Sequence, residues 1–476
     1  MSDALLFAPE LVLLFFGLIL FFCPVFEVSY RSTWLLGLAA GALALAASLW
    51  TLEMAGEPFA PGIYRVDFFS QFVKAALALG FLLIVAISRR PTTLQRAAWL
   101  EYPMFLLFAT LGTMMTVSAT EMLTLYIAME LSAYPLYIAV ALHRDPQTGG
   151  ESSTKYMIQG MVASAISLYG MSFLFGIFGS TYFSAIELGL SAAAGQPLFW
   201  IGLLLLLSGF FFKLAAFPFH FWAPDTYQTA PHQVVTFLAT ASKMAAIALL
   251  CRLVALAAHG TWDLLGISSV LLCMSVAAMT LGNLAALVQK DLKRLLGYSA
   301  VAHAGYVLVG LQTGTELGFS AALFYALGYL AMSFISFLVV CEVGRDSDLV
   351  AIEDLAGLHR RSPFLAATLL VGLFGLIGLP PTAGFVGKWF LFSAALQKGQ
   401  FALVLVAAVN AVVALYYYLL VFRQAYLAEP RTADPLATSP PVRVAALAGA
   451  ALVLVLGTFP DRFWDMAARA AAVLIG

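Results

Sequence analysis

The stretch Trp200-Ile-Gly-Leu-Leu-Leu-Leu-Leu-Ser-Gly-Phe-Phe-Phe-Lys-Leu-Ala-Ala-Phe-Pro218 places a lysine inside an apolar run that a proline then interrupts. About 20 mostly apolar residues are enough to cross a bilayer as a helix. A lysine there costs at least about 2.5–3.5 kcal/mol on insertion scales, so Lys213 is a functional-site hypothesis by default. Lys243 and Lys388 stand inside two further apolar runs.

The composition of the chain predicts an all-α integral membrane protein in contact with lipid. Of its 476 residues, 62% are hydrophobic and only 10% are charged, whereas about 25% charged residues is usual in soluble domains. The net charge of −1 gives no reason to expect a nucleic-acid partner. No positive n-region precedes the first apolar run, so we expect a retained helix rather than a cleaved signal peptide.

Motifs for binding a cofactor or a metal are missing from the sequence. It contains no GxGxxG, Walker A or HExxH pattern. Its cysteines, Cys23, Cys251, Cys273 and Cys341, are too far apart to indicate a disulfide framework or a cluster site. We therefore predict that this chain binds no cofactor or metal and has no redox centre of its own.

Fourteen apolar runs are candidate membrane spans. Their ranges are 5–26, 33–52, 69–87, 102–117, 122–142, 156–178, 198–217, 234–258, 264–288, 295–312, 319–343, 364–396, 401–426 and 442–459. The twelfth is too long for one straight helix and has Gly378-Leu-Pro-Pro381 in its middle. Proline removes a backbone donor and clashes with the preceding turn, which predicts two half-helices there.

The distribution of basic residues predicts the orientation. Of the 24 Lys and Arg residues, 15 fall in loops after odd-numbered runs, and only Arg65, Lys398, Arg462 and Arg469 fall on the opposite side. By the positive-inside rule, both termini should face the periplasm of a bacterial inner membrane. No long linker divides the chain, so residues 1–476 should form a single membrane domain.

Two units of five spans each are predicted within this domain. Residues 102–258 hold spans four to eight, and residues 264–426 hold spans nine to thirteen; the interrupted spans, seven and twelve, occupy the same place in each unit. Because five is odd, the second unit must be inverted relative to the first, an arrangement typical of ion-translocating folds. Residues 1–101 would add N-terminal helices, and residues 442–476 a C-terminal helix and tail.

Glu130 is the carboxylate that we expect to interact with Lys213. It lies in Leu125-Tyr-Ile-Ala-Met-Glu-Leu-Ser-Ala-Tyr-Pro135, near the middle of the fifth span. Burial and an opposite charge shift carboxyl and amine pKa values in opposing directions, so a Glu–Lys pair would change protonation when it separates. The alternative is a static ion pair.

Lys243 and Lys388 are the two further candidates for proton transfer. Small neighbours around Lys243, in Ala241-Ser-Lys-Met-Ala-Ala246, leave room for water. Lys388 follows the proline-interrupted segment, where backbone carbonyls freed by the break must find other partners. Both positions predict a transport role.

Two histidines are weaker candidates. His220 follows the break in the seventh span and His303 lies within the tenth. Imidazole can pass a proton near neutral pH, but a lone helical histidine is often a packing residue, so both interpretations stay open. The aromatic run at 416–418 indicates lipid-facing or packing side chains.

Other basic residues have simpler explanations. Lys155, Lys74 and Arg252 lie near the ends of spans, where their long side chains can reach the headgroups. Lys293 belongs to a basic cluster with Lys290 and Arg294 that favours a positive-inside anchor over a proton site. Lys155 and Lys293 nevertheless remain secondary candidates for proton transfer.

Four segments also carry a family resemblance. They are Phe212-Lys-Leu-Ala-Ala-Phe-Pro-Phe-His-Phe-Trp-Ala-Pro-Asp-Thr-Tyr-Gln-Thr-Ala-Pro231, Ser242-Lys243, Lys293-Arg-Leu-Leu-Gly-Tyr-Ser-Ala-Val-Ala-His-Ala-Gly-Tyr306 and Gly378-Leu-Pro-Pro-Thr-Ala-Gly-Phe-Val-Gly-Lys388. They resemble the antiporter-like membrane subunits of the respiratory NADH:quinone oxidoreductase, complex I. The length resembles the subunit N branch, since the subunit L branch carries an additional long lateral helix.

The resemblance implies a proton-pumping subunit. Glu130 and Lys213 would form the coupled pair, Lys243 the central relay and Lys388 the distal site. NADH, FMN, iron–sulfur clusters and quinone would bind to other membrane and peripheral subunits of the complex. A subunit of a cation/proton antiporter or a membrane-bound hydrogenase, and a scaffold that does not pump, are the alternatives.

Overall fold

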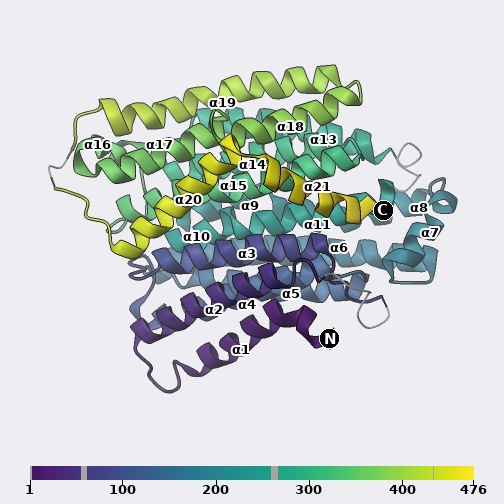
Figure 1. Ribbon diagram of the computed structural model, residues 1–476, viewed down its shortest axis with the longest axis horizontal. Helices are drawn as coiled ribbons and strands as arrows, with labels where there is room; N and C mark the ends of the chain where they lie inside the picture. Colours follow the sequence, from purple (N-terminus) through teal and green to yellow (C-terminus); the bar gives the residue numbers. More distant parts are fainter. Residues whose placement is uncertain (1–2, 55–61, 259–265, 432–433, 476) are drawn as a thin grey trace.

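A computed structural model describes residues 3–54, 62–258, 266–431 and 434–475. These residues form α-helices and three short 3-10 helices, η1 (Asp3–Phe7), η2 (Arg96–Trp99) and η3 (Ile352–Leu355), and they contain isolated β-bridges but no named strand. Most of the helices run roughly along the longest axis of the molecule (Figure 1). Gly476 and the start of the predicted 264–288 span lie outside the described residues.

Three helices form the N-terminal part of the bundle. They are α1 (Ala8–Phe22), α2 (Tyr30–Trp50) and α3 (Phe68–Ile87). A capping box starts α3: the Asp67 carboxylate accepts from the Ser70 backbone N–H at 2.7 Å, and the Ser70 hydroxyl accepts from the Asp67 N–H at 3.0 Å. This cap satisfies backbone donors that would otherwise be orphaned at the helix end.

The next group of helices contains two interruptions. It consists of α4 (Tyr102–Ser118), α5 (Met122–Ala141), α6 (Pro146–Phe178), α7 (Phe183–Ala193), α8 (Pro197–Leu214), α9 (Trp222–Thr229), α10 (His232–Ala239) and α11 (Ala241–Ala258). The predicted seventh span is broken between α8 and α9. The eighth is also divided, at Thr240, whose hydroxyl donates back to the Thr236 carbonyl at 2.5 Å. Such back-bonding competes with helical hydrogen bonding, and this second interruption was not predicted from the sequence.

The third group follows after residue 266. It consists of α13 (Ile267–Leu287), α14 (Leu292–Leu311), α15 (Glu316–Val343), α16 (Leu358–Arg361), α17 (Pro363–Ile377), α18 (Ala383–Gln397) and α19 (Phe401–Leu427). Helix α17 ends at Ile377, the next residue, Gly378, has a φ of +88°, and α18 begins five residues after this glycine. The proline-containing run therefore forms two helices, as its sequence predicts.

The chain ends with α20 (Pro440–Thr458) and α21 (Asp461–Ile475). The hydropathy of the sequence predicts only a tail after residue 459. Helix α21 forms because Ala467, Ala470 and Ala471 gather on one face, which is buried, while Asp461 and Arg469 stay exposed. It packs against α15 and α3.

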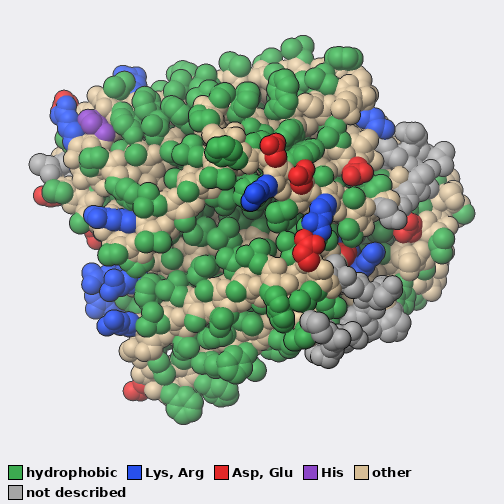
Figure 2. All heavy atoms as spheres, in the orientation of Figure 1, with side chains coloured by type: hydrophobic (Ala, Val, Ile, Leu, Met, Phe, Trp, Pro, Cys, Tyr) green, Lys and Arg blue, Asp and Glu red, His purple; other side chains and the backbone are tan. Residues whose placement is uncertain are grey.

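Eleven helices in the described residues are long and apolar enough to cross a membrane. The most hydrophobic window of α15 is buried along its whole length, because α15 packs against helices from every part of the chain, α3, α10, α11, α14, α17, α18, α20 and α21. The face shown in Figure 2 is mostly hydrophobic, with Lys and Arg gathered at one end and a second charged group over α21. A fully buried central helix inside a bundle with an apolar outer surface is typical of a protein that is surrounded by lipid.

Candidate functional site

The end of α8 is the first element of the site. Lys213 is its second-to-last residue, and Ala215 ends the helix in a left-handed conformation with a φ of +56°. The Lys213 ammonium donates to the Met129 carbonyl oxygen at 3.0 Å and makes a very short hydrogen bond to the Ser132 hydroxyl. Both acceptors lie on α5, so this lysine joins α5 to the break after α8.

Glu130 lies beside this contact but outside it. Its side chain is half-buried, and its Oε1 has no hydrogen-bond partner in the described part of the chain. No ion pair within 4.0 Å joins it to Lys213 among the described residues, so the direct pair that we expected is not formed. Met129 and Ser132 share the α5 face that points to α8, whereas Glu130 is about 100° around the helix from Met129.

Lys243 stabilises the broken end of α8 from another direction. It lies in the first turn of α11, is almost fully buried, and makes a very short hydrogen bond to the Leu214 carbonyl oxygen. Trp222 donates its indole N–H to the Phe212 carbonyl at 2.8 Å, and its ring lies 5.8 Å from the Lys243 ammonium. The last backbone carbonyls of α8, which would bond within the helix if it continued, thus accept hydrogen bonds from side chains.

Lys388 satisfies the last carbonyls of α17, as Lys243 does for α8. Its ammonium donates to the carbonyls of Leu376 at 3.1 Å and Ile377 at 2.8 Å. A Cβ at Gly378 would come within 3.1 Å of the Lys388 Cδ, so the glycine lets the lysine approach closely. The ends of two half-helices, α8 and α17, therefore each receive a buried ammonium at the negative end of the helix dipole.

His303 lies in a buried cluster of tyrosines. Its Nδ1 is 2.5 Å from the Tyr325 hydroxyl, and its Nε2 is 3.4 Å from the Tyr418 hydroxyl, which also bonds to Ser299. The Tyr306 ring lies between this cluster and α18, because its centroid is 5.8 Å from the His303 ring and 4.6 Å from the Lys388 ammonium. The structure thus brings two sequence candidates from distant segments to one aromatic ring.

The remaining candidates divide between buried and exposed positions. His220 is buried between the rings of Phe217 and Phe221, and its Nδ1 has no hydrogen-bond partner among the described residues. Lys155 is exposed and pairs with Glu151 at 2.5 Å, which fits the surface interpretation.

Lys293 requires a correction. The favoured interpretation was an anchor in a loop, yet the side chain is fully buried in the first turn of α14 and donates to the Ala230 carbonyl at 3.2 Å. Ala230 lies between α9 and α10, directly after the last residue of α9. A carbonyl left free there provides a partner for the ammonium, as at the other helix breaks. Burial raises the pKa of the nearby Asp291 carboxyl, which caps α14.

Lys74 and Arg252 also differ from their expected position at the headgroups. Lys74 is fully buried and pairs with Glu10 at 2.6 Å, while Tyr64 donates its hydroxyl to the same carboxylate at 2.5 Å. Arg252 donates to both carboxylate oxygens of Asp67 at 3.0 and 2.8 Å. The sequence pattern could not reveal these pairs because the partners are between 64 and 185 residues apart.

Comparison with known proteins identifies the family of this chain. Residues 119–414 match the family model described as NADH:quinone oxidoreductase/Mrp antiporter, TM. A curated relative from Syntrophobacter fumaroxidans, named NADH-quinone oxidoreductase subunit N 2, is 45% identical over 98% of this chain and 99% of its own length. The chain belongs to this family.

The fold of this family member is similar to chains of known structure. A chain of respiratory complex I from Thermus thermophilus is 34% identical, with a TM-score of 0.83 over 97% of this chain and 99% of that one. A chain of the Mrp complex from Dietzia is only 21% identical, with a TM-score of 0.88 over 100% of this chain and 98% of that one. The Mrp likeness shows a shared fold.

The sequence analysis did not predict some of the buried hydrogen bonds in this family member. Tyr417 and Tyr418 are buried, which fits the packing interpretation of the run at 416–418, but their hydroxyl bonds were not predicted. Tyr417 donates to the Asn283 side-chain oxygen at 3.0 Å, and Asn283 donates to Asn410. Two asparagines inside apolar runs were the available signal, since an amide in lipid needs a partner. Within the described residues, no group of three or more His, Cys, Asp or Glu side chains could hold a metal ion.

Proposed function

We propose that this chain translocates protons as a membrane subunit of a respiratory NADH:quinone oxidoreductase. The observation that carries the proposal is the pair of buried ammonium groups, Lys243 and Lys388, placed at the ends of interrupted helices. Buried cations in membrane segments are expensive and mark ion pathways. The relatives named subunit N favour complex I over an antiporter, because the family model covers both classes and the Mrp structure shows only a shared fold.

Lys213 is the switch in this proposal. Its ammonium is held by Met129 and Ser132 on α5, and a rotamer change would let it exchange these acceptors for the neighbouring Glu130 carboxylate. A Glu–Lys pair that forms and separates changes the protonation of both groups. Lys243 contacts the residue after Lys213 and would receive the proton, and Lys388 would release it farther along the membrane.

The proposed topology has fourteen crossings and an inverted repeat. Helices α4 to α11 form the first unit and α13 to α19 the second, with the α8–α9 and α17–α18 breaks in matching places. Both termini face the periplasm of a bacterial inner membrane. The two ends of the chain lie toward the same end of the bundle, which supports an even number of crossings (Figure 1).

The entry route in this proposal starts at the opposite end. A hollow of about 570 Å³ is lined by Lys155, Asp225 and Arg294, and Arg294 donates to Asp225 at 2.5 Å. Lys293, the neighbour of Arg294 in the chain, is fully buried and does not line the hollow itself. His220 and Lys293 would conduct protons from this hollow toward Lys243. NADH, FMN, iron–sulfur clusters and quinone would be held by other subunits.

Replacing Lys213 by alanine in the assembled complex tests the proposal. We expect coupled proton pumping to fall by roughly tenfold or more, because proton transfer by a positioned group contributes that much or more. Glu130→Gln should act in the same direction, and Glu130→Asp more mildly. Pumping would be followed by dye quenching in membrane vesicles, with comigration on native gels as the measure of assembly.

Lys398→Ala is the matched control. It removes the same charge from an exposed position just after α18 that lies outside the proposed pathway, and it should leave pumping near the wild-type rate. Wild-type pumping in an assembled Lys213→Ala complex would favour a scaffold that does not pump. Comigration with small antiporter subunits would favour a cation/proton antiporter, and comigration with nickel–iron hydrogenase subunits would favour a membrane-bound hydrogenase.

A further inference from the structure

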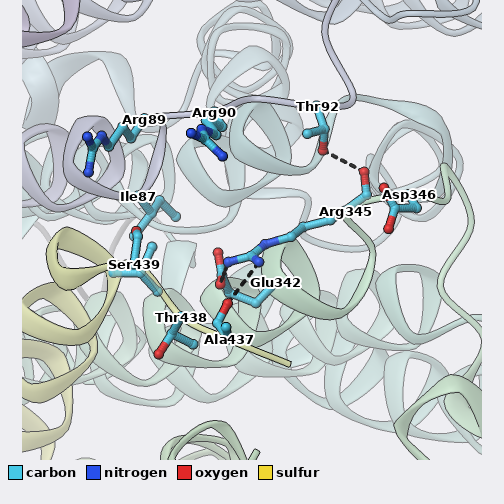
Figure 3. Close-up of a pocket in the computed structure, with 11 residues that line it drawn as sticks. Ile87, Arg89, Arg90, Thr92, Glu342, Arg345, Asp346, Ala437, Thr438 and Ser439 are labelled. Atoms are coloured by element: carbon cyan, nitrogen blue, oxygen red, sulfur yellow. Dashed lines mark hydrogen bonds and ion pairs between the residues drawn. The ribbon is translucent and has the colours of Figure 1, made fainter. Parts of the chain in front are cut away.

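A basic hollow separate from the proposed entry route lies at the end of the bundle where α3 finishes. Its volume is about 470 Å³, and it is formed by the loop after α3, the end of α15 and the start of α20. Figure 3 shows Arg89 and Arg90 side by side on one wall and Ser439 nearby. The hollow is large enough for a polar headgroup.

Arg89 and Arg90 differ from several arginines on the same side of the protein. Both are exposed, and no ion pair or side-chain hydrogen bond connects either guanidinium to another residue that the structure describes. In contrast, Arg144 pairs with Asp348 at 2.8 Å, and Arg294 with Asp225 at 2.5 Å. Two adjacent guanidinium groups without a carboxylate partner provide a strong site for a phosphate oxygen.

The acidic residues of the hollow do not neutralise this pair. Glu342 is occupied by a very short ion pair with Arg345, which also donates to the Ala437 carbonyl at 2.9 Å. Asp346 lies at the opposite end of the hollow from Arg89 (Figure 3). The Ser439 hydroxyl is available for a ligand, because it makes no capping hydrogen bond at the start of α20.

The position of the hollow identifies the class of ligand. Arg89 and Arg90 directly follow the last turn of α3, a predicted membrane span, so they lie at headgroup depth. The Arg89 guanidinium lies 5.9 Å from the centroid of Trp34, an aromatic residue typical of the membrane interface. Val444 and Leu447, 67% and 60% exposed on α20, extend an apolar strip from the hollow toward the membrane interior.

From this geometry we infer that the hollow binds the phosphodiester headgroup of an anionic phospholipid, with its acyl chains along α20. The unpaired Arg89 and Arg90 bind the phosphate, and Val444 and Leu447 contact a chain. Basic pockets between membrane helices on the cytoplasmic side bind anionic headgroups in this way. The inference does not depend on the proposed proton function.

The test uses the purified complex in nanodiscs of phosphatidylcholine with a trace of photoreactive phosphatidylglycerol. We expect labelling of peptides that contain residues 87–92 and 437–447, found by mass spectrometry. Arg89→Gln/Arg90→Gln should lower this labelling roughly tenfold, because each basic residue near the surface adds to the attraction of anionic lipid. Arg89→Lys/Arg90→Lys should retain part of it.

Arg31→Gln/Arg96→Gln is the matched control, since both residues are exposed on the same side but do not line the hollow. Unchanged labelling in this control and unchanged NADH oxidation by all variants would support the inference. Equal labelling by a photoreactive phosphatidylcholine would overturn it. So would displacement of the lipid by millimolar inorganic phosphate, or cross-linking of the two arginines to an acidic segment of a neighbouring subunit.

Discussion

At the scale of single residues, the interior of this protein depends on polar groups that find partners across great distances in sequence. Tyr418 is fully buried on α19 and bonds through its hydroxyl to Ser299 on α14, within reach of His303. Tyr416, two residues earlier, is 60% exposed. Two tyrosines on one helix, one buried and one exposed, can therefore be compared directly.

We expect Tyr418→Phe to destabilise the protein and Tyr416→Phe to leave it unchanged. The first substitution deprives buried polar groups of a partner, at a cost of about 1–3 kcal/mol. Thermal unfolding of the detergent-solubilised complex would measure stability, and dye quenching would measure pumping. Equal effects of the two substitutions would mean that the hydroxyl network around His303 has no special role.

At the scale of elements, the interrupted helices decide where charge is placed. A continuous α8 would satisfy its own carbonyls and leave Lys243 without an acceptor in an apolar interior. Because α8 stops at Leu214 and α17 stops at Ile377, each ammonium meets a negative helix end. Each helix break thus provides acceptors for a buried ammonium, and each ammonium satisfies the carbonyls that the break leaves free.

Lys243→Arg and Lys388→Arg separate these two roles. Arginine can still donate to the carbonyls and stabilise the helix ends, but it cannot release its proton in the accessible pH range. We expect normal assembly with coupled turnover lowered by roughly tenfold or more. Quinone reduction and proton pumping would be measured together. Wild-type rates in both variants would show that the lysines act as fixed charges.

The ion pair between α1 and α3 predicts a stability effect without a direct effect on proton transfer. Lys74→Met would leave the Glu10 carboxylate buried without its cation, which typically costs about 3–5 kcal/mol. The double substitution Glu10→Gln/Lys74→Met should recover much of this loss, because no unpaired charge remains. Thermal unfolding of the single and double variants would show the recovery. An additive loss would contradict the pairing.

At the scale of the whole molecule, the predicted number of membrane crossings determines which side of the membrane the C-terminus faces. With fourteen crossings, a cysteine at Gly476, which lies outside the described residues, should react with a membrane-impermeant thiol reagent in intact spheroplasts. The background would be a version that lacks the four native cysteines. A cysteine at Arg96 should react only after permeabilisation. The opposite labelling pattern would overturn the crossing number and the inverted repeat.

The amino-acid sequence by itself was sufficient to predict a helical membrane protein, the family and the break at Gly378. These follow from local properties: the length of apolar runs, the missing N–H of proline and specific strings such as Pro218-Phe-His-Phe-Trp-Ala-Pro-Asp225. The amphipathic pattern of α21 was also present in the sequence but was passed over, because its polar residues lower the hydropathy below that of a span.

Only the tertiary structure decided which polar groups meet. Lys293 is buried against Ala230, Lys74 pairs with Glu10, and Lys213 bonds to Met129 and Ser132 instead of the expected Glu130. Each of these contacts joins segments far apart in sequence, so no spacing rule could identify it. The physical reason is that, in an apolar interior, a charged group takes whichever acceptor the helix packing brings within reach, and packing is a property of the whole bundle.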